Sequence, residues 1–141
     1  MADPRVAGNL TGIKGVNATF IIDNSTITYS ATAAGGSASV GLAVKLTDDY
    51  TIALTTDGCA VLGKLLSVES DGMATVQIAG VMALPSGASA ALTVGAAIVG
   101  DLDGSTAGYI RAAASGTAAE LILCRGLILA NDDTAAVVVW L

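Results

Sequence analysis

The chain of 141 residues contains no histidine, and aromatic side chains make up only 4% of it. Histidine is the commonest general base at neutral pH and the commonest metal ligand, so most hydrolytic and transfer mechanisms lose their central residue. Glycosidase clefts are usually lined with aromatic side chains, and one Trp, three Tyr and one Phe are too few to build one. We therefore expect a protein that is not an enzyme and that binds no cofactor.

Positive charge is also scarce, because six Lys and Arg face twelve Asp and Glu, for a net charge of −6. Binding to a phosphate backbone requires cations gathered on one patch. The six cations are instead scattered along the chain: Arg5, Lys14, Lys45, Lys64, Arg111 and Arg125. We expect no nucleic-acid partner.

Cysteine is limited to Cys59 and Cys124, which lie far apart and form no CxxC pair. This spacing excludes a zinc ribbon and a thioredoxin-like site. Both residues have apolar neighbours, so we expect buried free thiols, with a disulfide between them left open.

Long apolar runs are missing as well. The longest, residues 88–100, is rich in Ser, Thr and Gly and is shorter than the roughly 20 residues that span a bilayer. Residues 1–12 lack the apolar segment of a signal peptide. We expect synthesis in the cytoplasm and no membrane partner.

The hydrophobic fraction is high, at 53%, but much of it is alanine. Burial is worth about 25 cal/mol per Å² of apolar surface, whereas ordering a residue costs about 1.5 kcal/mol. A core of small side chains leaves little surplus, so we expect a thin core that association between subunits completes.

Alternation of apolar and polar residues predicts strands through most of the chain. In residues 16–22, Val16, Ala18, Phe20 and Ile22 share one face, and a second run over 27–33 is expected to pair with it as a hairpin. Further strands are predicted at 40–47, 50–54, 59–62, 92–98, 109–112, 121–130 and 134–141.

Two local motifs stand out. Residues 66–70 and 73–78 flank Asp71-Gly72, a pair suited to the positive φ angles of a type I′ hairpin turn. Thr117 and Glu120 have the spacing of a helix capping box, which favours one short helical turn.

Many short strands separated by Gly and Asp turns predict an all-β fold, a small antiparallel β-sandwich or β-barrel with an extended N-terminal arm. The arm is residues 1–14, which show no sustained alternation. Residues 15–141 are expected to form a single β domain, with 15–54 as an added hairpin.

Paired acids are the only material for catalysis or metal binding, and we expect them all to be turn residues: Asp48-Asp49, Asp101 with Asp103, and Asp132-Asp133. The Asp-x-Asp-Gly at 101–104 is similar to the start of a calcium loop, but its twelfth position is Ala112 instead of Glu. We therefore expect no metal site.

Residues 55–141 resemble the bacteriophage head-decoration or capsid-cement proteins. The first part of the likeness lies in 63–68 (GKLLSV), 71–72 (DG), 76–78 (VQI), 80–81 (GV), 92–99 (LTVGAAIV) and 103–104 (DG). The second is the ending, 125–129 (RGLIL) followed by 131–141 (NDDTAAVVVWL).

The resemblance implies a small barrel or sandwich that forms a homotrimer on the capsid exterior of a virion and bridges neighbouring major capsid proteins. The partners would be the major capsid protein and further copies of the chain itself. The residues predicted to make subunit or capsid contacts are Arg5, Val6, Leu10, Phe20 and Trp140.

Two other classes stay open on the sequence. One is a β-rich fibre or adhesin module that binds a cell-surface receptor or glycan, for which exposed Tyr or Trp side chains would be the sign. The other is a minor enzyme domain, which would require a carboxylate pair converging in a pocket.

Overall fold

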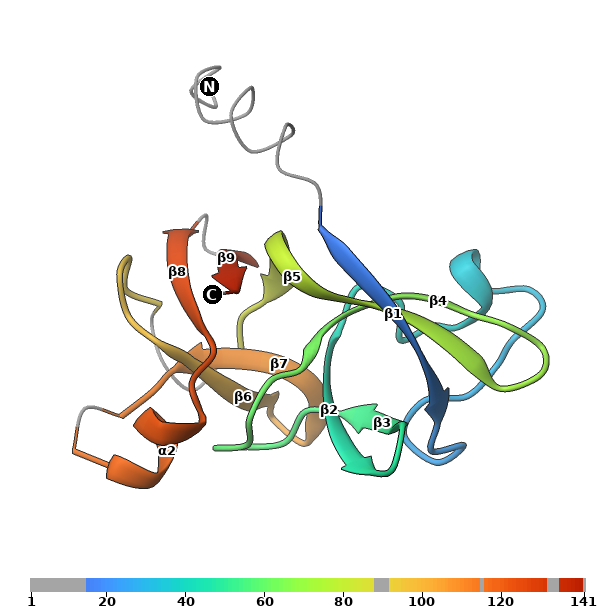
Figure 1. The fold of residues 1–141 in the computed structure, drawn as a ribbon, viewed down its shortest axis with the longest axis horizontal. Helices are drawn as coiled ribbons and strands as arrows, with labels where there is room; N and C mark the ends of the chain where they lie inside the picture. Colours follow the sequence, from blue (N-terminus) through green and yellow to red (C-terminus); the bar gives the residue numbers. More distant parts are fainter. Residues whose placement is uncertain (1–14, 88–91, 115, 132–134, 141) are drawn as a thin grey trace, which may run out of the picture.

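The structure, a computed structural model, describes residues 15–87, 92–114, 116–131 and 135–140, the last of these for the backbone only (Figure 1). Within these residues the chain is mostly β. The strands are β1 (Val16–Ile22), β2 (Ala43–Asp48), β3 (Thr51–Leu54), β4 (Gly63–Val68), β5 (Met73–Pro85), β6 (Ile98–Asp103), β7 (Thr106–Ala112), β8 (Gly126–Asn131) and β9 (Ala135–Trp140). The helical segments are η1 (Ala34–Gly36) and α2 (Ala118–Leu123). The predicted all-β fold is confirmed.

Five strands close into a small barrel in the order β1-β3-β2-β4-β5, because β5 also pairs with β1. The β1–β3 pair is parallel, and the other barrel pairs are antiparallel. Closure leaves the barrel without an open sheet edge. Its interior is filled by aliphatic side chains: Ile22, Ile27, Val44, Ile52, Leu54, Leu62, Leu65, Val68, Ala74 and Val76.

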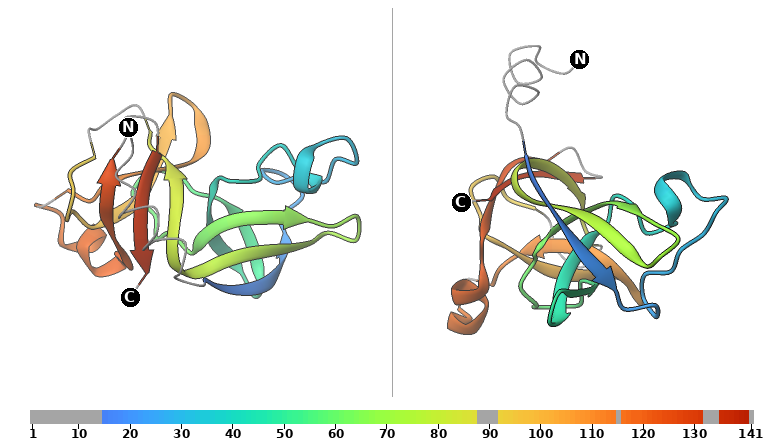
Figure 2. Two further views of the ribbon diagram at one scale, coloured as in Figure 1. Left: turned by 90° about the horizontal axis from the view of Figure 1, so that it is seen from above. Right: turned by 45° about the vertical axis from the view of Figure 1, so that its right-hand side comes forward.

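Strand β5 is 13 residues long and takes part in two sheets. Its first half pairs with β1 and β4 in the barrel, and its second half pairs with β9 from Gly80 to Pro85. The change occurs at Gly80, whose φ of 105° is a conformation that favours glycine. Figure 2 shows β5 bending as it passes from the barrel to the second sheet.

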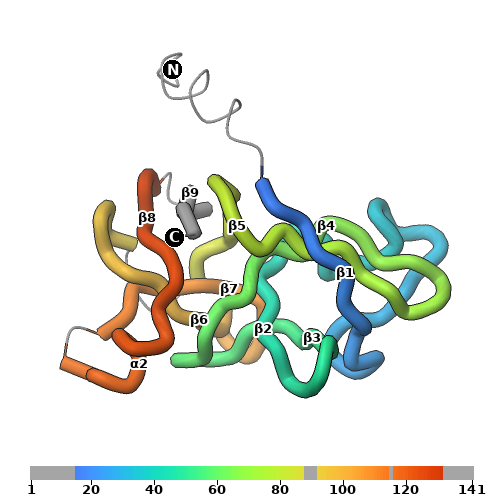
Figure 3. Tube along the Cα trace, in the orientation of Figure 1, coloured from blue at the N-terminus to red at the C-terminus, as the bar shows by residue number. Residues whose placement is uncertain are grey.

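The second sheet continues from β5 to β9 and β8, and the β6–β7 hairpin packs beneath it (Figure 3). A second core lies between them: Ala43, Val61, Met82, Leu84, Leu92, Ile98, Ile110 and Ile128. Both cores consist mainly of Ile, Leu and Val, so the expectation of a thin core of small side chains is wrong. Most of the alanines whose side chains the structure describes lie outside the buried set, and the composition of the chain could not predict which residues would be buried.

The predicted hairpin at 66–78 is confirmed, with Leu65 opposite Val76 and Val68 opposite Ala74. Its turn differs from the type I′ prediction, because only Gly72, at φ 84°, has a positive φ. The Gly72 N–H donates to Glu69 O at 3.1 Å, and the Glu69 N–H donates to Met73 O at 2.7 Å. This is a type I turn followed by a left-handed glycine, which also suits the right-handed twist of the strands.

The predicted hairpin between 16–22 and 27–33 is wrong. β1 forms, but its partners are β3 and β5, and residues 27–33 contain no strand. Asp23 ends β1, because its carboxylate accepts hydrogen bonds from the N–H groups of Thr26 and Ile27, each at 3.0 Å. This turn directs the Ile27 side chain into the barrel, where it is fully buried. Residues 15–54 therefore supply three of the five barrel strands.

Three other predicted strands are shorter than expected or absent. Residues 59–62 form no strand, and the strand predicted at 92–98 begins only at Ile98, because Gly95 lies in a turn at φ 86°. Instead of a strand from 121, the predicted helical turn continues as α2 to Leu123. Within the described part of the chain, no helix is long and apolar enough to cross a membrane.

We predict that Asp23→Ala lowers the free energy of unfolding by about 1–3 kcal/mol, because Ser25, Thr26 and Ile27 lose the half-buried carboxylate that accepts their hydrogen bonds. Burial raises the pKa of Asp23, but hydrogen bonds from Ser25, Ile27 and Thr26 outweigh it and lower the pKa to about 2. The contribution of Asp23 is therefore present above its ordinary pKa of 3.8 and is lost as the pH falls toward 2.

Urea denaturation of wild type and variant between pH 7 and pH 2 measures both effects. Asp49→Ala, in the exposed β2–β3 turn, is the matched control and should change stability by less than about 0.5 kcal/mol. An equal loss in the two variants would contradict this role for Asp23.

Candidate functional site

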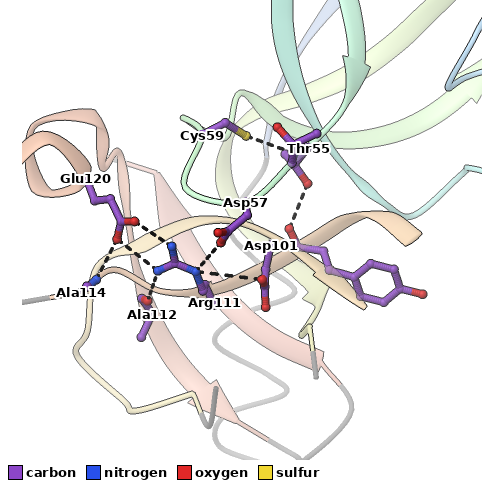
Figure 4. Close-up of polar contacts among 10 residues, drawn as sticks. Thr55, Asp57, Cys59, Asp101, Arg111, Ala112, Ala114 and Glu120 are labelled. Atoms are coloured by element: carbon purple, nitrogen blue, oxygen red, sulfur yellow. Dashed lines mark hydrogen bonds and ion pairs between the residues drawn. The ribbon is translucent and has the colours of Figure 1, made fainter. Parts of the chain in front are cut away.

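The described polar side chains converge most closely around Arg111 on β7, whose side chain is 14% exposed (Figure 4). Its Nε donates to Asp57 Oδ1 at 2.8 Å, and its two terminal nitrogens donate to the Glu120 carboxylate at 2.7 and 3.1 Å. Asp101 Oδ1 lies 4.0 Å from Nε. We call Arg111, Asp57, Asp101 and Glu120 the Arg111 cluster.

The cluster joins segments that are far apart in the sequence. Asp57 lies in the loop after β3, Asp101 on β6 and Glu120 on α2. The loop follows the edge of β6, where the Gly58 N–H donates to Gly100 O at 3.0 Å. Thr55 Oγ1 donates to Tyr109 O at 2.9 Å, so the same loop is also bonded to β7. The cluster therefore connects the barrel to the β6–β7 hairpin and to α2.

Electrostatics keep these charges paired. The hydrogen bond from Arg111, together with one from the Ala114 N–H, lowers the pKa of Glu120 to about 2, despite burial, which acts the other way. The bond to Glu120 raises the pKa of Arg111 above its already high ordinary value, with burial opposing and Asp57 adding to the shift. A cation committed to several carboxylates cross-links the fold. The ion pairs of the cluster therefore hold β7, the loop after β3 and α2 together.

Glu120 explains why the capping box is incomplete. Thr117 lies at the N-cap of α2 as predicted, but its side chain makes no capping hydrogen bond. Glu120 does not complete the box, because its carboxylate turns to Arg111 and to the Ala114 N–H at 2.9 Å. The sequence signal located the helix correctly and assigned Glu120 to the wrong partner.

The paired acids are placed differently from one another. Asp48 and Asp49 lie at the β2–β3 turn as predicted. Asp101 is not a turn residue, because it lies within β6, is 3% exposed and faces Arg111. Asp103 is exposed at the end of β6, and Asp132-Asp133 lie outside the described residues. Among residues that the structure describes, no three acids or cysteines are grouped so as to hold a metal ion.

Cys59 and Cys124 are free and only half-buried, so the expectation of full burial is wrong. The Cys59 sulfur accepts a hydrogen bond from the Thr56 N–H at 3.3 Å, and the Cys124 thiol donates to Glu120 O at 3.1 Å. Burial, and then the charge of Glu120, raise the pKa of the Cys124 thiol. Cys124 is therefore held as a thiol and is a poor nucleophile.

Of the five predicted contact residues, the structure describes Phe20 and the backbone of Trp140, and these two lie on different strands. Phe20 is half-buried and packs against the barrel core. Trp140 lies in the second sheet, with its backbone opposite Gly80 and Gly126. Arg5, Val6 and Leu10 lie outside the described residues. Their role in contacts stays a prediction.

Sequence reasoning missed an apolar face formed by α2 and β8. On β8 the side chains alternate, so that Ile128 is buried in the second core while Leu127 and Leu129 are exposed. Helix α2 has no buried residue, and Leu121, Leu123 and especially Ile122, at 81%, are exposed. We call these five side chains the α2/β8 face. The sequence did not predict this face, because its pattern indicates one strand over residues 121–130, in which every second apolar side chain would be buried.

Arg125, which lies between α2 and β8, lines two cavities, and one of them also contacts this face through Leu127. One, of about 160 Å³, lies against β2 and the loop before β4, and its lining residues are Lys45, Leu46, Cys59, Ala60, Val61, Leu62 and Arg125. The other, of about 280 Å³, is lined by Ala97, Cys124, Arg125, Gly126 and Leu127. The face therefore combines protruding aliphatic side chains with an adjacent hollow.

Comparison with known proteins gives no relative for the chain, because no family model, curated protein or solved structure matches it.

We predict that Glu120→Gln destabilises the protein at neutral pH, because Arg111 loses its two-pronged carboxylate partner. The stability difference between wild type and variant should shrink as the pH falls from 4.5 to about 2, the interval in which Glu120 is ionised in the folded but not the unfolded chain.

Thermal unfolding followed by circular dichroism at a series of pH values tests this. Glu69→Gln makes the same substitution at an exposed glutamate of the β4–β5 turn and controls for the loss of one negative charge. If the stability difference for Glu120→Gln persisted at pH 2, the ion pair would not be its cause.

Proposed function

We propose that the chain is a structural capsid decoration, or cement, protein, which binds the exterior of a bacteriophage capsid and stabilises contacts between major capsid proteins. The observation that carries the proposal is the number of large apolar side chains that are exposed, most of them on strands and on helix α2 and three of them, Tyr29, Tyr50 and Val94, in turns and loops. The exposed members are Val16, Ile21, Tyr29, Leu46, Tyr50, Val94, Leu121, Ile122, Leu123, Leu127 and Leu129. Groups of exposed apolar residues are typical of interaction surfaces.

The sheet edges favour contact through side chains over addition of a strand. The barrel is closed. At the outer edge of the second sheet, Ile128 is already bonded on its free side, because its N–H donates to Ala96 O at 3.0 Å and its carbonyl accepts from the Gly95 N–H at 2.8 Å. A protein built in this way offers preformed faces, and it associates with little reorganisation of its backbone.

The resemblance of residues 55–141 to decoration proteins supports the same proposal and suggests the partners. In this function no bond is made or broken. Each subunit adds buried contact area, worth about 25 cal/mol per Å² of apolar surface before the costs of association. Joining several copies would multiply weak contacts with the shell into strong overall attachment.

We predict that the purified full chain forms an oligomer and binds saturably to capsids assembled without it, and that binding raises the temperature at which these shells release their DNA. Sedimentation of labelled protein with shells measures the binding, and competition by excess unlabelled protein controls for adhesion. A chain that stays monomeric and does not sediment with shells would exclude a cement role.

One observation favours the alternative, a fibre or adhesin module that binds a cell-surface glycan. Tyr50 is 74% exposed at the β2–β3 turn, and Tyr29 is also exposed. Tyr50 has a φ of 52°, a left-handed conformation that is uncommon for a bulky residue. Strained exposed residues are often found at binding sites.

If the alternative holds, a glycan array will give clear hits that Tyr50→Ala reduces at least tenfold in apparent affinity, because stacking on the ring is lost. Tyr109→Phe, which keeps the ring of a half-buried tyrosine on β7, is the control. An array without hits would count against the adhesin function and leave the cement proposal standing.

A further inference from the structure

We infer that the α2/β8 face is the surface through which one copy of this chain binds a second copy. The inference goes beyond the proposed function, on which it rests only for the expectation that several copies act together. The residues that carry it are Leu121, Ile122, Leu123, Leu127 and Leu129, together with the Arg111 cluster that holds α2 in place.

Helix α2 buries none of its side chains against the part of the chain that the structure describes. It has six residues. Isolated helices of this length are unstable in water, and most helical stability in proteins comes from packing one face. The main attachment of α2 to the rest of the molecule is Glu120, through Arg111 and the Ala114 N–H. The cluster thus holds in solvent a helix whose last three residues are Leu121, Ile122 and Leu123.

The chemistry of the face indicates its occupant. Glu120, the one acid of α2, and Asp57 are both paired with Arg111. The five members of the face are all aliphatic. Interfaces between copies of one chain are more apolar and poorer in charge than interfaces between proteins that also exist apart. A face of five aliphatic side chains, bordered by the paired acids and by one cation, Arg125, therefore fits a second copy better than a highly charged partner.

The net charge of the molecule also limits where two copies can meet. Two copies with a net charge of −6 each repel one another, so they associate best where acids are few. Glu69 and Asp71 lie in the β4–β5 turn. This hairpin and helix α2 lie at opposite ends of the molecule (Figures 1 and 2). Contact through the α2/β8 face keeps these acids of the two copies apart.

Shape suggests how the copies fit. The cavity of about 280 Å³ beside Leu127 adjoins the protruding helix that precedes β8. If the helix of each copy enters the hollow of the other, both copies use the same face and the contact has two-fold symmetry. Such pairing would join copies in the way that the proposed function expects.

The test compares wild type with Ile122→Asp by sedimentation velocity over a wide concentration range. Wild type should sediment as an oligomer, and the variant should dissociate at least tenfold more readily, because a carboxylate is buried in an apolar contact. Ile21→Asp, the same substitution at an exposed position on β1, should leave association unchanged. Circular dichroism checks folding, and Ile122→Gln offers a milder change should Ile122→Asp fail to fold.

Shell binding, measured in parallel, separates this inference from the proposed function. Wild type that is monomeric at every concentration, or an Ile122 variant that associates like wild type, would overturn the inference. If the monomer still bound shells and Ile122→Asp weakened that binding, the face would belong to the capsid contact and the cement function would stand. An oligomer that Ile122→Asp disrupts but that never binds shells would support the inference and refute the cement function.

Discussion

The ion pairs of Arg111 are the interaction on which the placement of the outer elements depends. One guanidinium on β7 holds the loop after β3 through Asp57 and helix α2 through Glu120, at 2.8 and 2.7 Å. The two hydrophobic cores account for the barrel and the second sheet, but neither contains a residue of α2. The ion pair between Arg111 and Glu120 therefore holds α2 in place, as apolar packing holds the strands. The aliphatic side chains of the helix stay exposed.

The residues that stabilise the fold are distinct from the apolar residues that are exposed for contact with a partner. Large aliphatic residues fill both interiors, and the closed barrel and the covered edge at Ile128 leave little backbone for a partner to pair with. The large apolar side chains that remain exposed lie mostly on strands and on α2. Such a surface suits a protein that acts by binding, and it explains why a chain without histidine and with few aromatic residues can still have a defined role in the function we propose.

Local signals in the sequence were reliable, and signals that depend on distant partners were not. The hairpin around Gly72, the helical turn after Thr117 and the closing strands could be predicted, because each depends on neighbouring residues. The pairing of β1 with β3 and β5 could not, since alternation gives the face of a strand and not its partner. Asp101 appeared to be a turn residue because its partner, Arg111, comes ten residues later on another strand. The α2/β8 face was hidden by the same limit, because strand and helix patterns are ambiguous over a short run such as Leu121 to Leu123.

The continuity of β5 has a mechanical consequence. Because a single strand is shared by the barrel and the second sheet, tension applied to one is carried along covalent bonds into the other and does not depend on a flexible linker. The ladders that β5 forms with β1, β4 and β9 would be loaded along the strand, in the direction in which many hydrogen bonds resist together. A pull across a chain of this design would therefore pass through β5 itself.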